Sequence, residues 1–339
     1  MFLEIVVPTY NRAHILRSTL TELCAAVSTQ SEHLALRVID NSSTDATPDV
    51  VKYFSDRMLL RSDRNASNIG LVRNIARCIS TSSAEWVWVF GDDDHVLLHC
   101  LPMLLRELKR LPQDVVFARG LAAKVDEKSR LVWVDSQLNA NNKQPAIIYN
   151  PGLDIVKHGS IHSLAFISQL FIRPAHWDQS YHDSIYKDSD LYTFVLTLLH
   201  ESLEKSTADL NFHVVAATDR GDRGYYTPNM CVARLTEYLN FEKLVFAAAG
   251  PKRARRMLKK GRKHLLRQRI ASVFKLIGYR SAYRIDGRDP ISFMLSYQSP
   301  YCIDQIIVRA LALLATIPAI RECFKSIYDN LLEFHQRRT

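Results

Sequence analysis

Apolar and polar positions follow two different periods over the first hundred residues. Leu16, Leu20, Leu23 and Val27 keep three- and four-residue spacing, which predicts an amphipathic helix over 13–27. Compact runs of β-branched and aromatic residues predict strands, and helical signals follow the first three of them. The predicted strands span 3–7, 34–39, 58–61 and 86–90, and the further helices span 47–54 and 71–79.

This order of strands and helices predicts an α/β fold with a mostly parallel sheet flanked by helices on both faces. The run at 86–90 is apolar throughout, as expected of a strand buried on both faces. Three polar clusters follow strand ends, namely Pro8-Thr9-Tyr10, Asp40-Asn41 and Gly91-Asp92-Asp93-Asp94. Because open parallel sheets bind ligands at the carboxyl ends of their strands, these clusters predict a binding edge.

The remaining chain is mixed at first and then helical. A helix is predicted over 101–110, strands over 114–118, 131–134 and 165–172, and a further helix from Asp190. Beyond about residue 230 the pattern is almost entirely helical. We therefore expect a catalytic domain over 1–225, with halves 1–98 and 99–225, and a helical region over 226–339.

Composition narrows the class of protein. The chain has 339 residues, 47% hydrophobic and 23% charged, which is ordinary for a globular protein. We expect neither a membrane-spanning helix nor a secretory signal. Six scattered cysteines, with no C-x-x-C pair, argue against a zinc site or a disulfide framework and favour the reducing cytoplasm.

The acidic run is the strongest chemical signal. Three successive carboxylates after a buried strand repel one another and lose solvation, so the run is costly without a cation. Hard cations such as Mg²⁺ and Mn²⁺ prefer oxygen ligands and often share them with phosphates. The alternative is a solvated acidic turn that caps a helix after His95. The position after an all-apolar strand favours a metal site made by Asp92, Asp93 and Asp94.

Four short motifs in this order resemble the family 2 glycosyltransferases, whose fold is the Rossmann-like nucleotide-diphospho-sugar transferase (GT-A) fold. The motifs are Val6-Val7-Pro8-Thr9-Tyr10-Asn11-Arg12, Ile39-Asp40-Asn41-Ser42-Ser43-Thr44-Asp45, Asn68-Ile69-Gly70-Leu71-Val72-Arg73-Asn74 and Phe90-Gly91-Asp92-Asp93-Asp94. Each is modest alone, and their order and spacing make the signal specific. The last motif is also similar to that of bacterial transferases for surface polysaccharide and O-antigen.

The resemblance implies roles for individual residues in binding a nucleotide-sugar donor. The segment Pro8, Thr9, Tyr10 and Asn11 would pack against the base and ribose, and Asp40 with Asn41 would read the base. Asn68, Gly70 and Arg73 would lie beside the diphosphate, where an arginine offsets phosphate charge. Asp92 and Asp93 would contact the donor as well as the metal.

The acidic run departs from the commoner Asp-x-Asp-Asp form, because Gly91 stands in place of its first aspartate. The register of the metal ligands is therefore open. We favour Asp92 and Asp94 as the pair on the metal side, with Asp93 close behind.

Inverting transfer needs a carboxylate that takes the proton of the acceptor hydroxyl. In similar enzymes this base lies in a Glu-Asp-x-Asp/Glu-Leu stretch that opens a helix, and Lys187-Asp188-Ser189-Asp190-Leu191 matches that stretch with lysine in place of glutamate. Asp188 is the first candidate for the base and Asp190 the second. The alternative is that Asp188 or Ser189 only caps the helix. His162, Trp177, Tyr181 and His182 are candidates for lining an acceptor site.

The net charge of +9 is concentrated in one segment. Residues 251–288 hold 14 Lys and Arg against one acid, Asp286, and apolar residues interleave with them at helical spacing. A basic amphipathic helix of this kind predicts binding to an anionic membrane surface. A solvated helix face is the plain alternative. We expect no nucleic-acid partner, since no stacking platform or known motif accompanies the charge.

Together these features predict an inverting, Mn²⁺- or Mg²⁺-dependent glycosyltransferase of bacterial surface polysaccharide synthesis. We expect a hexosyl- or deoxyhexosyltransferase that extends a polyprenyl-diphosphate-linked glycan at the cytoplasmic face of the membrane. The oligomeric state is open, and the apolar C-terminal helices offer a surface for a homo-oligomer. A sugar nucleotidyltransferase is the first alternative, although Pro8-Thr9-Tyr10 stands after the first strand in place of the glycine-rich basic loop of that class. A non-catalytic, membrane-associated protein that keeps the fold is the second.

Overall fold

The computed structural model describes residues 1–30, 32–126, 131–134, 144–155, 164–186 and 191–218, and in the C-terminal part short stretches between 242 and 277, residues 289–296, 302–323 and 326. The chain divides into two compact units, Met1–Asp219 and Arg220–Thr339. The predicted domain boundary at residue 225 lies outside the described residues and stays a prediction.

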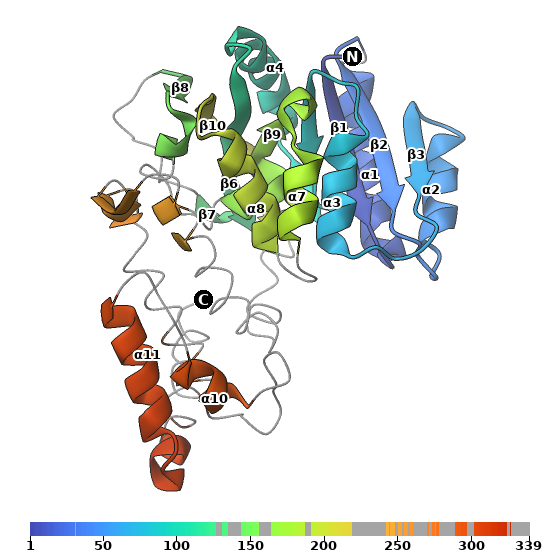
Figure 1. The fold of residues 1–339 in the computed structure, drawn as a ribbon. Helices are drawn as coiled ribbons and strands as arrows, with labels where there is room; N and C mark the ends of the chain where they lie inside the picture. Colours follow the sequence, from blue (N-terminus) through green and yellow to red (C-terminus); the bar gives the residue numbers. More distant parts are fainter. Residues whose placement is uncertain are drawn as a thin grey trace. The chain divides into compact units, whose positions relative to one another are not determined.

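The first unit is built on one ten-stranded sheet (Figure 1). Eight strands form a continuous order β3-β2-β1-β4-β9-β6-β10-β5, with β7 paired to β6 and β8 paired to β10. The strands are β1 (Leu3–Thr9), β2 (Leu34–Asp40), β3 (Leu60–Arg64), β4 (Trp86–Val89), β5 (Asp94–Val96), β6 (Val115–Val125), β7 (Leu131–Val134), β8 (Ala146–Tyr149), β9 (Leu170–Ile172) and β10 (Ser206–Thr218).

The first four strands are parallel, as the sequence predicts. Every residue of β1, β2 and β4 is buried, which explains why apolar residues dominate them. The exceptions inside β1 and β2, Glu4 and Arg37, are buried as an ion pair at 3.3 Å. In β3, at the end of the order, only Leu60 is buried. The chain order reverses between β1 and β4, because β2 and β3 lie on one side of β1 and all later strands on the other. Such a switch point leaves a crevice at the carboxyl ends of the strands.

The second half of the sheet is mixed rather than mostly parallel. β9 runs antiparallel to both β4 and β6, and β10 is parallel to β6 but antiparallel to β5 and β8. The strand predicted over 165–172 is shorter, since the 3-10 helix η3 (Ile167–Gln169) precedes β9. The acidic run continues into β5 and no helix starts at His95, so the helix-capping alternative for this run is wrong.

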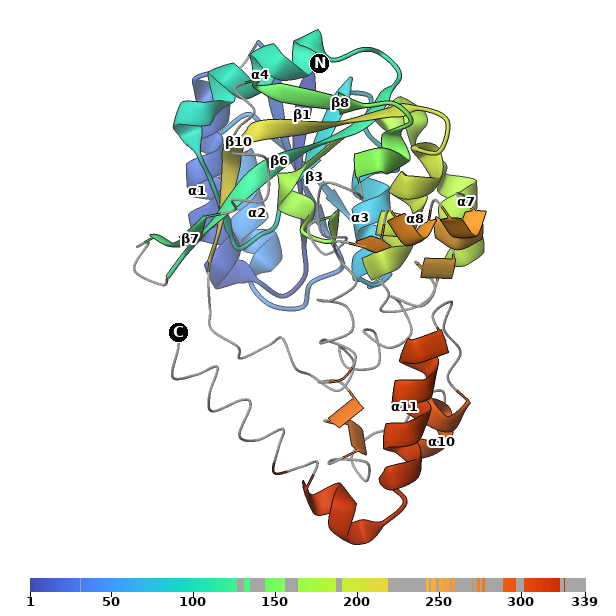
Figure 2. The same cartoon turned by 90° about the vertical axis from the view of Figure 1, so that its left-hand side faces the viewer.

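Helices cover both faces of this sheet (Figure 2). The apolar sides of α1, α2 and α4 share one large core with the sheet, in which Trp86, Trp88 and Phe90 are fully buried. On the other face α3 packs against β1 and β4 and also contacts α7 and α8. These helices are α1 (Ala13–Ser28), α2 (Thr47–Ser55), α3 (Leu71–Ser80), α4 (Leu101–Arg110), α7 (Gln179–Ile185) and α8 (Leu191–Glu201). The remaining 3-10 turns are η1 (Leu98–Cys100), η2 (Gly152–Asp154) and η4 (Pro174–His176).

Local boundaries differ from the predictions where side chains form tertiary contacts. Thr47 is the first residue of α2 rather than its N-cap, and Asp45 accepts a hydrogen bond from the Thr47 amide instead. The Thr47 hydroxyl is used elsewhere, since it accepts a hydrogen bond from the amide of Arg12 at 3.0 Å. The loops after β1 and β2 are thereby joined.

The second unit is helical where it is described. Asp289 caps α10 (Pro290–Leu295) by accepting hydrogen bonds from the amides of Ile291 and Ser292. The longer helix α11 (Cys302–Leu314) shares a small apolar core with α10 and with Val273, Leu276 and Ile277, and this core includes Met294 and Val308. Among the described residues, no helix has both the length and the apolar character needed to span a membrane.

Candidate functional site

Polar loops from four strand ends meet at the switch point of the sheet. The loop after β1 and the acidic run after β4 come from neighbouring parallel strands, and the loops after β2 and β3 continue the same edge. The structure thus brings together Thr9, Asp40, Asn41 and Asp92, which the sequence predicts at one edge.

Two loop residues adopt left-handed backbone conformations that shape this edge. Asn11 has φ 52° and Ser42 has φ 65°, and asparagine is among the few residues that tolerate this region. The backbone amide of Asn11 donates to Ser43 Oγ at 2.9 Å, and the side-chain oxygen Oδ1 of Asn11 accepts from the backbone amide of Thr44 at 2.8 Å. The side chain of Asn11 therefore fastens two loops together. Tyr10 beside it is 41% exposed, and a base or sugar can reach it.

The acidic run is attached to the first loop through Asp92 and Asp93. Thr9 Oγ1 donates to Asp92 Oδ2 at 2.8 Å, and Arg12 Nη1 lies 3.2 Å from Asp93 Oδ2 and 3.9 Å from Asp92 Oδ1. The side chain of Asp92 is 12% exposed and that of Asp93 34%. Below them, Thr19 of α1 donates to the backbone oxygen of Asp92. Both carboxylates are held in position and still reach solvent.

Asp94 has different surroundings. Its side chain is buried and accepts a short hydrogen bond from the Ser168 hydroxyl, which itself accepts from the Gly91 amide at 2.8 Å. Burial raises the pKa of the Asp94 carboxyl to about 7. A group held this way faces the protein interior. The geometry therefore favours Asp92 and Asp93 as the pair that reaches the crevice, rather than the pair Asp92 and Asp94 favoured by the sequence.

Gly91 makes room for this arrangement. A Cβ atom at residue 91 would lie 2.6 Å from Asp94 Oδ2 and 3.1 Å from Ser168 Oγ. The first contact is closer than van der Waals packing permits, and the second is tight. An aspartate at residue 91, as in the commoner motif, is incompatible with the position of the Asp94 carboxyl here.

His95 connects the run to the end of β10. Its Nδ1 lies 2.9 Å from Glu22 Oε1 and its Nε2 3.1 Å from the Thr218 hydroxyl, which donates to the backbone oxygen of Asp93. The hydrogen bond with Glu22 raises the pKa of His95. The acidic run is thus held from α1 and from β10.

The carboxylate of the second loop is held in hydrogen bonds within the protein. Asp40 is buried, and its two carboxylate oxygens accept from the Ser43 amide at 2.9 Å and from Arg64 Nη1 at 2.7 Å. Asn41 donates to Asn68 Oδ1 at 2.8 Å, which ties this loop to the segment before α3. That Asp40 and Asn41 read the base stays a prediction, and in this geometry Asp40 also orders its own loop.

Gly70 and Arg73 begin α3 at the same edge. Gly70 has φ 83°, which glycine adopts without strain, and a Cβ there would lie 3.3 Å from the hydroxyl of Tyr186. The guanidinium of Arg73 lies over the Tyr186 ring, 4.0 Å from its centroid. Tyr186 therefore connects the end of α7 to the start of α3. Asp188 and Asp190 follow it in sequence and lie outside the described residues, as does His162.

The residues at the crevice fit a hard divalent cation. Two carboxylates on successive residues offer oxygen ligands, and they already attract one cationic group, Arg12. Two protein carboxylates suit a cation that completes its coordination with phosphate oxygens and water. Mn²⁺ or Mg²⁺ is therefore compatible with Asp92 and Asp93.

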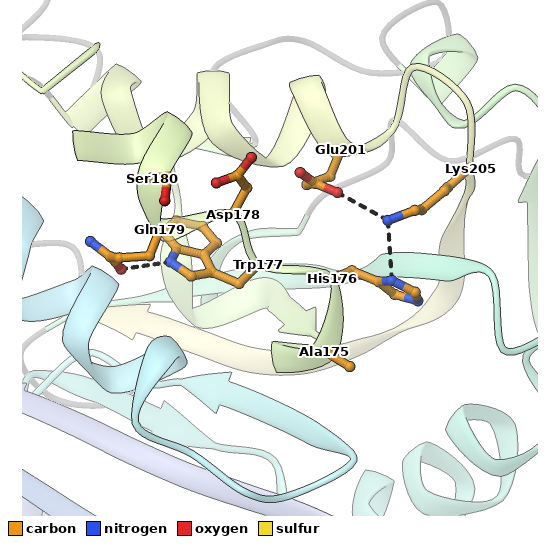
Figure 3. A pocket seen from close by; sticks show the side chains of 8 residues that line it. All are labelled: Ala175, His176, Trp177, Asp178, Gln179, Ser180, Glu201 and Lys205. Atoms are coloured by element: carbon orange, nitrogen blue, oxygen red, sulfur yellow. Dashed lines mark hydrogen bonds and ion pairs between the residues drawn. The ribbon is translucent and has the colours of Figure 1, made fainter. Parts of the chain in front are cut away.

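A pocket of about 360 Å³ lies on the opposite edge of the sheet (Figure 3). His176 lines this pocket, and its ring hydrogen-bonds to the carbonyl oxygen of Gln113, which lies just before the first residue of β6. The pocket is therefore at the edge where β6 begins, opposite the edge that carries the acidic run. Asp178, His200 and Glu201 offer ligand atoms within 4.8 Å of one another, the one such three-residue group among the described residues. They already have structural partners: Asp178 caps α7, Glu201 pairs with Lys205 at 3.1 Å, and His200 stacks on Tyr181. Of the aromatic candidates for an acceptor site, Trp177 also lines this pocket and His182 is fully buried.

Sequence reasoning missed four side chains that build the site, namely Arg12, Thr19, Arg64 and Ser168. Arg12 belongs to the first motif, so its position beside the loop was a usable signal. Thr19 and Arg64 lie inside a helix and a strand, where nothing in the pattern marks them. Ser168 comes from a different half of the chain, and its contact with Gly91 depends on the tertiary fold.

Comparison with known proteins indicates one protein family. The sequence model of glycosyl transferase family 2 matches residues 4–178. The abequosyltransferase RfbV of Salmonella typhimurium is 28% identical over 111 residues, which cover 31% of this chain and 32% of that protein. A validoxylamine A glucosyltransferase of Streptomyces hygroscopicus is 44% identical over 59 residues, 17% of this chain and 14% of that protein. The chain thus matches about a third or less of the length of these relatives.

The fold is similar to that of solved structures. The crystal structure of S. aureus TarS 1–349 gives a TM-score of 0.55 at 16% identity, covering 100% of this chain and 92% of that chain. The complex of the same protein with UDP-GlcNAc gives a TM-score of 0.54 at 15% identity. This likeness confirms the predicted α/β architecture with its C-terminal helices.

Proposed function

The chain belongs to glycosyl transferase family 2, and from that premise we propose that it transfers a sugar from a nucleoside-diphosphate donor to a glycan acceptor with a divalent cation at Asp92 and Asp93. The observation that carries the proposal is the position of these carboxylates at the switch point, fastened to the loop after β1 through Thr9. Ligands of open α/β sheets bind at this place.

Each loop has a task in this proposal. The segment Pro8–Asn11 and Asn41 line the nucleoside part of the crevice, with exposed Tyr10 as its aromatic surface. Asn68, Gly70 and Arg73 flank the diphosphate at the start of α3, where unpaired helix amides favour an anion. The cation, held by Asp92 and Asp93, supplies positive charge that stabilises the leaving diphosphate.

The base belongs to residues 187–190, with Asp188 as first candidate and Asp190 as second. Tyr186, immediately before this segment, contacts Gly70 and Arg73 at the binding edge, and α8 begins immediately after it. Both α7 and α8 pack on α3. These anchors support a base that comes from the segment between them and acts at the donor site, taking the proton of the acceptor hydroxyl as the sugar is transferred with inversion.

The relatives support a substrate class. RfbV is an abequosyltransferase, and the similar TarS structure was solved with UDP-GlcNAc. We therefore place the donor among the nucleotide sugars used for bacterial surface polysaccharide, transferred as a hexosyl or deoxyhexosyl group to a polyprenyl-diphosphate-linked glycan of the O-antigen kind.

Attachment to the cytoplasmic face of the membrane is part of the same proposal. In the basic segment 251–288, Lys252, Arg255, Arg256 and Lys259 are exposed, whereas Ala254 and Leu258 are buried. On α11 and just after it, Ile306, Leu313 and Ile317 are 64%, 63% and 49% exposed at helical spacing. A cationic surface and an exposed apolar stripe suit an anionic lipid interface. The same stripe is our candidate for homo-oligomer contacts.

A panel of nucleotide sugars tests the activity. Hydrolysis and transfer are measured for UDP-, GDP-, CDP- and dTDP-sugars in Mn²⁺, in Mg²⁺ and in EDTA, with wild type, Asp92→Asn plus Asp93→Asn, and the exposed control Asp56→Asn. We expect one nucleotide class to react in Mn²⁺ or Mg²⁺ and not in EDTA, and the double variant to lose at least a hundredfold. Metal-independent turnover that survives in the double variant would sink the proposed role of the cation.

Two further variants assign the base. Asp188→Asn is expected to lose transfer while it retains donor binding, and Asp190→Asn to lose much less. The reverse order would show that Asp190 is the base.

Liposome sedimentation tests the membrane proposal. We expect salt-sensitive binding to anionic vesicles and none to neutral ones. Absence of binding to anionic vesicles at low salt contradicts it.

A further inference from the structure

Arg12 occupies a position between the two carboxylates that our proposed function assigns to the metal. Its Nη1 lies 3.2 Å from Asp93 Oδ2 and 3.9 Å from Asp92 Oδ1. The other Asp92 oxygen, Oδ2, accepts from Thr9. Arg12 therefore faces Oδ1 of Asp92, and Thr9 bonds to Oδ2 of the same carboxylate.

The side chain of Arg12 is partly exposed, while its backbone is held by hydrogen bonds. The Arg12 amide donates to Thr47 Oγ1, and the Arg12 carbonyl oxygen accepts from the Leu16 amide in the first turn of α1. The side chain itself is 40% exposed, and the Asp93 carboxylate that it contacts is 34% exposed. Ion pairs between exposed groups of this kind are weak and readily exchanged for another partner.

We propose that Arg12 is an internal counter-ion that couples metal binding to donor binding. Without donor, its guanidinium competes with the divalent cation for Asp92 and Asp93 and keeps metal affinity low. When a nucleoside diphosphate enters, the guanidinium turns to the phosphate oxygens, which it binds through two parallel hydrogen bonds, and leaves both carboxylates to the cation. Metal and diphosphate then strengthen each other's binding, because a coupling between two ligands is reciprocal.

This inference rests on the proposed function and predicts opposite effects on the two ligands. Removing a positive charge a few ångströms from the site makes it more attractive for Mn²⁺ alone. Removing it also takes away a phosphate contact. Lysine keeps the charge but lacks the planar pair of donors, so it separates the two effects.

The experiment measures Mn²⁺ binding by the loss of its free EPR signal, and UDP binding by calorimetry at zero and at saturating Mn²⁺. Four proteins are compared: wild type, Arg12→Gln, Arg12→Lys and the control Arg17→Gln, an exposed arginine one turn further along α1. We expect Arg12→Gln to bind Mn²⁺ alone about tenfold more tightly than wild type, with Arg12→Lys and Arg17→Gln unchanged. UDP affinity at saturating Mn²⁺ falls about tenfold in both Arg12 variants, and Mn²⁺ enhances UDP binding less in Arg12→Gln than in wild type.

Equal or weaker binding of Mn²⁺ alone by Arg12→Gln overturns the inference. Asp92→Asn plus Asp93→Asn separates this failure from that of the proposed function. If the double variant loses Mn²⁺ binding while Arg12→Gln matches wild type, the metal site stands and the role of Arg12 falls. If the double variant binds Mn²⁺ as wild type does, the metal site itself is wrong and the inference falls with it.

Discussion

Replacing Gly91 by alanine tests the account of the acidic run most sharply. The added methyl group lies 2.6 Å from Asp94 Oδ2 and 3.1 Å from Ser168 Oγ, so the Asp94 carboxyl must move and its hydrogen bond with Ser168 is lost or distorted. A buried polar group without its partner costs about 1–3 kcal/mol, and overpacking costs a similar amount. Both costs arise from the same movement of the Asp94 carboxyl, so they do not add in full. We expect a loss of about 2–4 kcal/mol in the free energy of unfolding.

Urea unfolding followed by tryptophan fluorescence measures this loss. All four tryptophans precede residue 219, so the signal reports the first unit. The matched control is the same Gly91→Ala change in an Asp94→Ala background, where the colliding carboxyl is absent. Only the 3.1 Å contact with Ser168 Oγ remains there, so the expected cost falls to about 1 kcal/mol. The coupling between the two sites is then about 1–3 kcal/mol. A Gly91→Ala cost that is equal in both backgrounds, or near zero in wild type, refutes the steric explanation.

Three further predictions concern other parts of the first unit. Asp209→Ala removes the two 2.8 Å hydrogen bonds that the buried guanidinium of Arg119 donates to Asp209. We expect the free energy of unfolding in urea to fall by about 3–5 kcal/mol, and a fall below about 1 kcal/mol would contradict the buried pair. Burial lowers the pKa of His182 in the folded protein. Below about pH 6.5 the unfolded chain therefore binds a proton that the folded chain does not, and the free energy of unfolding falls as pH falls. His182→Gln should show a smaller fall between about pH 7.5 and 5.5 than wild type, and an equal fall would disprove the role of His182. Thr9→Val should keep the fold but weaken Mn²⁺-dependent UDP binding about tenfold, as it removes the hydrogen bond to Asp92, whereas Thr9→Ser should retain it.

The sequence was sufficient to predict the first half of the sheet. Strands β1, β2 and β4 are buried on both faces, so apolar residues dominate them and they are easy to recognise, although Glu4 and Arg37 interrupt the first two. Loop clusters at their ends then follow from the geometry of parallel strands. The contact between Thr9 and Asp92, 83 residues apart, confirms that these clusters meet.

The second half could not be predicted in the same way. β10 is thirteen residues long and lies between β6 and β5 in the sheet, but Asp209, Asn211 and His213 interrupt its apolar pattern. Asp209 is tolerated in the core because Arg119 and Tyr149 bind its carboxylate. Such pairing depends on strands that are ninety residues apart, and no local pattern reveals it. β5 and β9 have three residues each, too short for a periodic signal.

The sequence alone also could not distinguish the three aspartates of the acidic run. Asp92, Asp93 and Asp94 are chemically alike, and their difference arises from Ser168, which captures Asp94, and from Arg12, which faces the other two. The glycine at residue 91, which replaces the aspartate of the commoner motif, is explained by the position of the Asp94 carboxyl.

Anomalous scattering from a crystal soaked with Mn²⁺ and UDP tests the central claim most directly. We predict a manganese peak within bonding distance of the carboxylates of Asp92 and Asp93, with diphosphate oxygens on its other side. A manganese peak at Asp178, His200 and Glu201 instead, or no peak beside Asp92 with UDP bound, would contradict the account.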